Sequence, residues 1–237
     1  MMFRLVTLTP PYFEIGPKLY LYGDAALDLA LHADELCRKF GVDIVFTAQY
    51  TDISRIANAT THLKVFAQHM DANPIGRGVG AVLPEAIKQA GAVGVLLNHA
   101  ERPLSLSVLN ETIRRADEVG LATLVCAGSV QESVAVAKLR PNVILAENPA
   151  LIGGGERSQE DALEIRRVNA AIAAVDEDIL VLHGAGINNE NDVYQVIRCG
   201  ADGTGSTSAI MRAADPKEML SRMIEAMSQA YRDRIAG

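Results

Sequence analysis

A short apolar run, Val93-Gly94-Val95-Leu96-Leu97, is followed at once by the polar stretch Asn98-His99-Ala100-Glu101-Arg102. A second run, Val143-Ile144-Leu145-Ala146, leads into Glu147-Asn148-Pro149 and then the glycine-rich loop Ile152-Gly153-Gly154-Gly155. Runs this apolar on consecutive residues are typical of parallel strands that are buried on both faces. The sequence therefore predicts an imidazole and a carboxylate at the carboxyl ends of parallel strands, where α/β proteins build their ligand sites.

Similar strand-like runs alternate with helix-like segments along the whole chain. We expect strands at residues 12–18, 43–48, 63–67, 92–97, 121–126, 143–146, 179–183 and 201–205. We expect helices at residues 25–40, 83–90, 104–119, 130–139, 159–175, 191–199 and 216–235, and a short helix that starts at residue 51 or 52. Eight such units predict an α/β fold of the closed (β/α)8 barrel type. Since no linker or change of composition divides the chain, residues 1–237 are expected to form one domain.

The composition narrows the possible partners. The net charge is −7 and the pI is near 5.3, so the chain offers no basic surface for nucleic acid or an anionic membrane. Any anion-binding site must therefore be built locally, from backbone N–H groups and one or two cations. Cys37, Cys126 and Cys199 are scattered and odd in number, which favours a reducing compartment. With no signal peptide or membrane-spanning run recognised, we expect a cytoplasmic protein.

A glycine-rich loop, residues 73–80, follows the third predicted strand. It could reach a neighbouring subunit, close over a ligand or be an ordinary connection. A homodimer or homotetramer is the expected assembly.

Several ordered blocks of the sequence resemble the triosephosphate isomerase family, in particular its short archaeal-type branch. The resemblance covers roughly residues 24–230. The blocks that carry it are residues 65–71, 83–86, 91–101, 147–155 and 184–187. It implies a TIM barrel that isomerises a small phosphorylated sugar in glycolysis and carbohydrate metabolism, without a cofactor.

The resemblance also implies roles for individual residues. The catalytic glutamate of the family falls on Glu147, its electrophilic histidine on His99 and its site lysine on Lys18. The phosphate-binding backbone positions of the family fall on Gly153, Gly186, Thr207 and Ser208. Glu101 resembles a residue that supports the site, and we expect it to form a salt bridge or hydrogen bond.

Three positions depart from the pattern of the family. The family places Asn-x-Lys at the end of the first strand, where this chain has Gly16-Pro17-Lys18. Asn148 stands where a proline is usual and Gly154 where a threonine is usual. Because glycine lacks a side chain, we expect open space beside the reacting carbons, and the substrate could be a triose phosphate or a four- or five-carbon homologue.

The implied reaction moves a proton between adjacent carbons of an aldose or ketose phosphate through an ene-diolate. Glu147 would act as the base and His99 would polarise the carbonyl as a neutral imidazole, roles that are inherited from the resemblance. Lys18 would stabilise the negative charge of the ene-diolate, although a solvated surface position for this lysine is equally compatible with the sequence.

Other functions remain as alternatives. A non-catalytic sugar-phosphate binder would explain the missing asparagine, but it would not need a base and an electrophile together. A lyase or synthase would need a lysine to form a Schiff base, and this chain has no lysine at the ends of the middle strands. His69, His99 and His183 could ligate a metal, yet no paired carboxylates accompany them, so no metal site is expected.

Overall fold

The computed structural model describes residues 8–147 and 159–236, in which eight parallel strands close into a barrel. The strands are β1 (Tyr12–Ile15), β2 (Asp43–Ala48), β3 (Lys64–Ala67), β4 (Gly94–Leu97), β5 (Ala122–Ala127), β6 (Val143–Ala146), β7 (Leu180–His183) and β8 (Gly203–Gly205). Each strand pairs with its neighbours in sequence, and β8 pairs with β1 to complete the ring. The predicted (β/α)8 architecture is confirmed.

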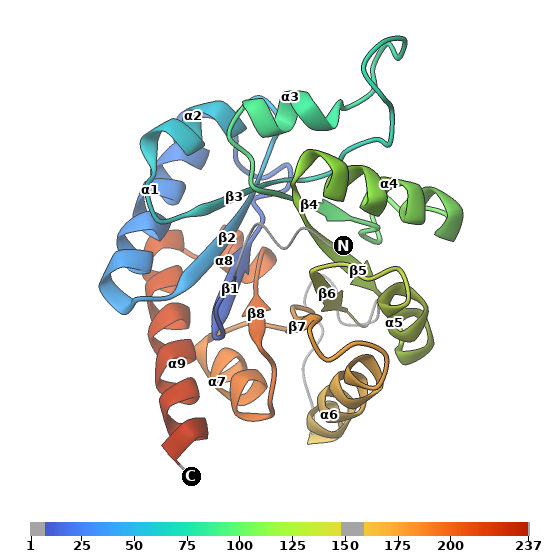
Figure 1. Ribbon diagram of the computed structural model, residues 1–237. Coiled ribbons are helices and arrows are strands. Elements are labelled where there is room, and N and C mark those ends of the chain that lie inside the picture. Colours follow the sequence, from blue (N-terminus) through green and yellow to red (C-terminus); the bar gives the residue numbers. More distant parts are fainter. Residues whose placement is uncertain (1–7, 148–158, 237) are drawn as a thin grey trace.

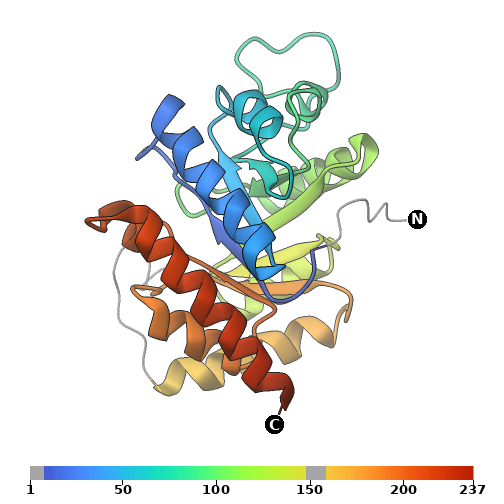
Figure 2. The same cartoon turned by 90° about the vertical axis from the view of Figure 1, so that its left-hand side faces the viewer.

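Helices surround this barrel (Figure 1). They are α1 (Gly23–Phe40), α2 (Ile53–Ala59), α3 (Pro84–Gln89), α4 (Leu106–Val119), α5 (Val130–Ala137), α6 (Gln159–Ala173), α7 (Glu190–Arg198), α8 (Ser208–Arg212) and α9 (Pro216–Ala236). The final helix, α9, packs against both α7 and α1, so the first and the last long helices lie side by side (Figure 2). The short helix α8 was not predicted from the sequence.

The core has two layers, one inside the barrel and one between the strands and the helices. The inner layer contains the buried side chains of Tyr12, Phe66 and Leu124. Glycines opposite the two aromatic rings make this packing possible. A Cβ atom would lie 2.4 Å from Cε2 of Phe66 if added to Gly94, and 2.6 Å from Cε2 of Tyr12 if added to Gly203. The glycine-rich composition of β8 is therefore required by a large neighbour in the barrel.

β1 is shorter than predicted, because it ends at Ile15 and not at Lys18. Pro17 has no N–H group to donate to a neighbouring strand. Lys18 has a φ of 46°, in the left-handed region that an extended strand excludes. This early end turns the lysine out of the strand and toward the cavity described below.

The segment between β3 and α3 reaches away from the body of the barrel (Figure 1). It exposes two apolar side chains, Ile75 at 73% and Val79 at 110% of their reference areas. Among the described helices, none is long and apolar enough to cross a membrane.

Candidate active site

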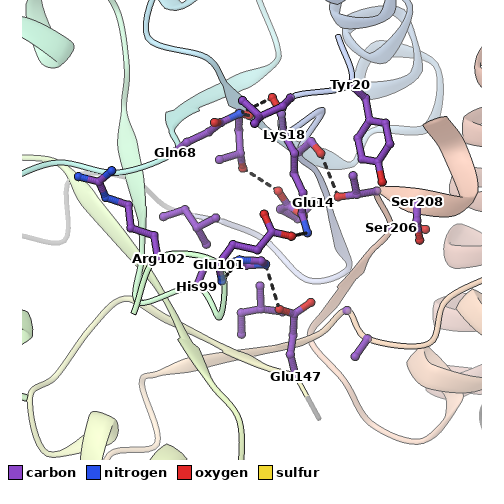
Figure 3. A pocket seen from close by; sticks show the side chains of 18 of the residues that line it. Glu14, Lys18, Tyr20, Gln68, His99, Glu101, Arg102, Glu147, Ser206 and Ser208 are labelled. Carbon is purple, nitrogen blue, oxygen red and sulfur yellow. Dashed lines mark hydrogen bonds and ion pairs between the residues drawn. The ribbon is translucent and has the colours of Figure 1, made fainter. Parts of the chain in front are cut away.

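A cavity of about 420 Å³ opens at the carboxyl ends of the strands. Its walls come from seven of the strands, β1 to β4 and β6 to β8, and from the segments that follow them. The described site residues inferred from the sequence, Lys18, His99, Glu147, Gly186, Thr207 and Ser208, all line it. Gly153, the remaining one, lies outside the described residues. Figure 3 shows the charged side chains converging from different strands.

Glu147 is the first residue after β6, and its side chain is 15% exposed. Its N–H group donates to the carbonyl of Ala127 at 3.0 Å, which fixes the strand end. Burial raises the pKa of the carboxyl to about 7; the charges of Glu14 and Glu101 add to the increase, and Lys18 opposes it. The buried Oε2 atom accepts no hydrogen bond within the described part of the chain. Glu147 is thus a carboxyl that gains or loses a proton near neutral pH.

His99 faces Glu147, with its Nε2 atom 3.6 Å from Oε2 of the glutamate. Burial and the positive charge of Lys18 lower the pKa of the imidazole, and Glu101 partly opposes them. The N–H group of Glu101 donates to Nδ1 of His99 at 3.1 Å. A neutral ring that accepts at Nδ1 carries its proton on Nε2. The geometry therefore presents a neutral N–H donor to the cavity.

Asn98 holds the turn that presents His99. Its φ of 57° lies in the left-handed region, which asparagine tolerates better than most residues. Its amide nitrogen donates to the carbonyl of Cys126 at 3.0 Å, and its amide oxygen accepts from the N–H of Leu104 at 2.9 Å. This positioning role was not inferred from the sequence, although the residue directly follows a buried strand.

Lys18 belongs to the cavity, and the solvated surface position considered from the sequence does not apply. Its side chain is 27% exposed, and its Nζ atom lies 2.8 Å from Oε1 of Glu101. Its carbonyl accepts hydrogen bonds from the side-chain amides of Gln49 at 2.9 Å and Gln68 at 3.2 Å. The expected salt bridge of Glu101 is confirmed, and it holds the ammonium group near His99.

The opposite wall is built from backbone after β7 and β8. Gly186 has a φ of 72°, a conformation that suits glycine. The Thr207 hydroxyl donates to the carbonyl of Gly16 at 2.9 Å, and Ser208 begins α8. The first N–H groups of a helix lack partners within it, so this wall offers donors to an anion.

Glu14 is a cavity residue that sequence analysis missed. It lies within the buried strand β1 and is 8% exposed. Burial raises the pKa of its carboxyl to about 6, against the lowering effects of the Thr47 hydrogen bond and the charge of Lys18. The only signal in the sequence was a charged residue in the middle of an otherwise apolar strand.

The expectation of open space beside Gly16 is wrong. A Cβ atom on Gly16 would lie 2.9 Å from Oε1 of Glu14 and 3.5 Å from Cβ of Thr47. The carboxyl of Glu14 already occupies the space that the glycine leaves.

Within the described residues, His99 does not gather with His69 and His183 into a metal cluster. Nε2 of His69 lies 3.2 Å from Oδ1 of Asp71, and Nε2 of His183 lies 2.8 Å from Oδ1 of Asn169. His69 lines the cavity, whereas His183 is buried in β7. Within residues 8–147 and 159–236, no three His, Cys, Asp or Glu side chains gather into a possible metal site.

Comparisons with known proteins point to one family. The family model for triosephosphate isomerase matches residues 18–227. The triosephosphate isomerase of Sulfurisphaera tokodaii is 37% identical over 221 residues, which cover 92% of this chain and 95% of the relative. That of Methanobacterium bryantii is 38% identical over 213 residues, covering 89% and 94%. The crystal structure of the Bartonella henselae enzyme superposes with a TM-score of 0.71 at 17% identity, covering 94% of this chain and 99% of that one.

Proposed function

This chain belongs to the triosephosphate isomerase family and isomerises a triose phosphate, and we propose that Glu147, His99 and Lys18 carry out the chemistry. Such a reaction needs a base beside the carbon that loses a proton and an electrophile beside the carbonyl oxygen. Glu147 and His99 face one another across 3.6 Å in the same cavity, which is the observation that carries the proposal.

Glu147 removes the proton, because a carboxyl with a pKa of about 7 is available as a base at neutral pH and can return the proton to the neighbouring carbon. The neutral N–H of His99 polarises the carbonyl. This division of roles is the established one for triosephosphate isomerases and is taken from the family. Lys18 places a positive charge where the ene-diolate develops.

The phosphate group lies against the backbone wall at Gly186, Thr207 and Ser208. A protein with a net charge of −7 must hold an anion through local donors, and these residues line the cavity together with the Lys18 ammonium group. Inorganic phosphate is accordingly expected to inhibit competitively with the triose phosphate.

Conservative substitution of the base tests this assignment. Glu147→Asp retracts the carboxylate by one methylene, and proton abstraction requires near-contact geometry. We expect kcat for the triose phosphate to fall by about a hundredfold or more with an unchanged melting temperature. Turnover near the wild-type value would rule out Glu147 as the base.

We further propose that the enzyme serves glycolysis in the cytoplasm and acts as a homodimer or homotetramer. All three cysteines are free, as in a reducing compartment. Exposed apolar residues lie on the projecting loop, at Ile75 and Val79, and also after β1, at Leu19 and Tyr22. Exposed apolar groups of this kind favour association with another subunit.

A further inference from the structure

Glu14 is a buried carboxylate that the proposed chemistry does not use. Its Oε1 atom accepts a hydrogen bond from the hydroxyl of Thr47 at 2.7 Å. Within the described ranges, no other group donates a hydrogen bond to this carboxyl, and both Glu14 and Thr47 line the cavity. Burying a carboxylate with so few partners is unfavourable, whereas an apolar side chain in a strand would pack without this penalty. A second partner in the cavity would explain why a carboxylate is present.

Glu14 and Gly16 form a matched pair. Oε1 of the glutamate lies 2.9 Å from the position of a Cβ atom on residue 16, so any side chain there would displace the carboxyl. The hydrogen bond from Thr47, on the adjacent strand β2, holds the carboxyl in this place. Figure 3 labels Glu14 among the side chains that line the cavity, and the charge of Lys18 acts on its carboxyl.

We propose that Glu14 determines substrate specificity in this enzyme: its carboxyl group hydrogen-bonds a hydroxyl group of the bound sugar phosphate, from the space that Gly16 leaves free. The proposal rests on the isomerase function and adds a contact to it. Because Glu14 shares the cavity with Lys18, His99 and Glu147, a substrate held by those residues lies within its reach.

The charges around Glu14 support this role. Lys18 lowers the pKa of its carboxyl less than burial raises it, so the group sits near 6 and can donate or accept a hydrogen bond close to neutral pH. The charge of Glu14 in turn raises the pKa of Glu147, on which Lys18 and Glu101 also act, and that of Cys126. Removing the charge of Glu14 should therefore lower the pKa of Glu147.

The first experiment compares Glu14→Gln with the wild type. Glutamine keeps the size of the side chain and an acceptor for Thr47, so the fold is preserved. We expect kcat/KM for the triose phosphate to fall about tenfold, because a hydrogen bond to an ionisable partner is replaced by one to a neutral amide. We also expect the acid limb of the pH profile to move to lower pH, since the charge that raises the pKa of Glu147 is gone.

Asp52→Asn is the matched control, because Asp52 is also a buried carboxylate, at 5% exposure, but lies outside the cavity. The pH profile of kcat/KM for Asp52→Asn should coincide with that of the wild type. An unchanged profile and kcat/KM in Glu14→Gln would overturn the proposal, as would an equal shift in both variants. Failure of Glu147→Asp to lose activity would instead refute the catalytic assignment, so the two failures are distinguishable.

The second experiment measures specificity. Glu14→Ala empties the space beside Gly16, so a sugar phosphate one carbon longer gains room while the triose loses a contact. The ratio of kcat/KM for a tetrose phosphate to that for the triose phosphate should rise at least tenfold, which corresponds to one methylene and one hydrogen bond. An unchanged ratio in the folded variant would contradict a role in specificity.

Discussion

At the scale of single residues, the two side chains that face each other in the cavity have pKa values shifted in opposite directions. Burial disfavours the charged form of both groups, so it raises the pKa of Glu147 and lowers that of His99. The same desolvated setting therefore makes the carboxyl a stronger base and keeps the imidazole neutral. Both properties are needed at the same pH for one group to take a proton while the other donates a hydrogen bond.

These shifts predict the pH dependence of the free enzyme. Since the pKa of Glu147 is about 7, kcat/KM should increase as the pH rises through 7, because the carboxylate form becomes populated. The lowered pKa of His99 keeps the imidazole neutral in this range, so its titration should not limit the same limb. Steady-state kinetics between pH 5 and pH 9 test this, and a limb centred near the ordinary glutamate value would contradict it.

The sequence predicted the identities of these residues better than their surroundings. His99 and Glu147 stood out because they directly followed apolar strands and lay in blocks that resemble the family, whereas Lys18 was assigned only as the nearest match to the lysine of the family. Glu14 was missed because its importance depends on the contact with Thr47 and on the empty position at Gly16, two features formed only when neighbouring strands pair.

At the scale of secondary structure, buried parallel strands were recognisable because their apolar runs are continuous. The exceptions have physical causes. β1 stops early at Gly16-Pro17, and α8 has only five residues and follows a glycine-rich strand, so neither boundary has a periodic signal. The composition of β8 becomes intelligible only from the packing of Tyr12 against Gly203.

The packing of β8 leads to a prediction on stability. Gly203→Ala places a Cβ atom 2.6 Å from the ring of Tyr12, which cannot be accommodated without movement. The free energy of unfolding should fall by about 1–3 kcal/mol, the usual cost of overpacking a core. Denaturant unfolding measures the change.

A double variant separates this clash from other effects of the substitution. Tyr12→Leu removes the ring that the new methyl group would meet, so Gly203→Ala should cost much less in that background. If the two costs simply add, contact with the ring is not the cause.

At the scale of the whole molecule, the barrel carries a ligand cavity and a projecting loop with exposed apolar side chains. One end carries the cavity, and the segment between β3 and α3, which exposes Ile75 and Val79, projects from the body of the barrel (Figure 1). The helix α9 packs against both α1 and α7 on the side of the barrel. A loop held out with apolar side chains exposed is suited to contact another subunit.

The proposed assembly depends on that loop. Val79→Asp places a charge on a fully exposed apolar position and should lower the mass measured by sedimentation from that of a dimer or tetramer toward that of a monomer. Leu163→Asp is the control, because Leu163 is 68% exposed on α6, far from the loop in sequence. An identical mass for the two variants would exclude this loop from the interface.

Proton transfer by Glu147 is the central claim, and exchange with solvent tests it most directly. When the triose phosphate is isomerised in D2O, a proton held by the base can exchange with solvent before it returns to carbon, so product from the wild type should carry deuterium at the reacting carbon. Glu147→Gln should incorporate none above the uncatalysed background, because an amide cannot accept the proton. Equal deuterium incorporation by Glu147→Gln and the wild type would contradict the account.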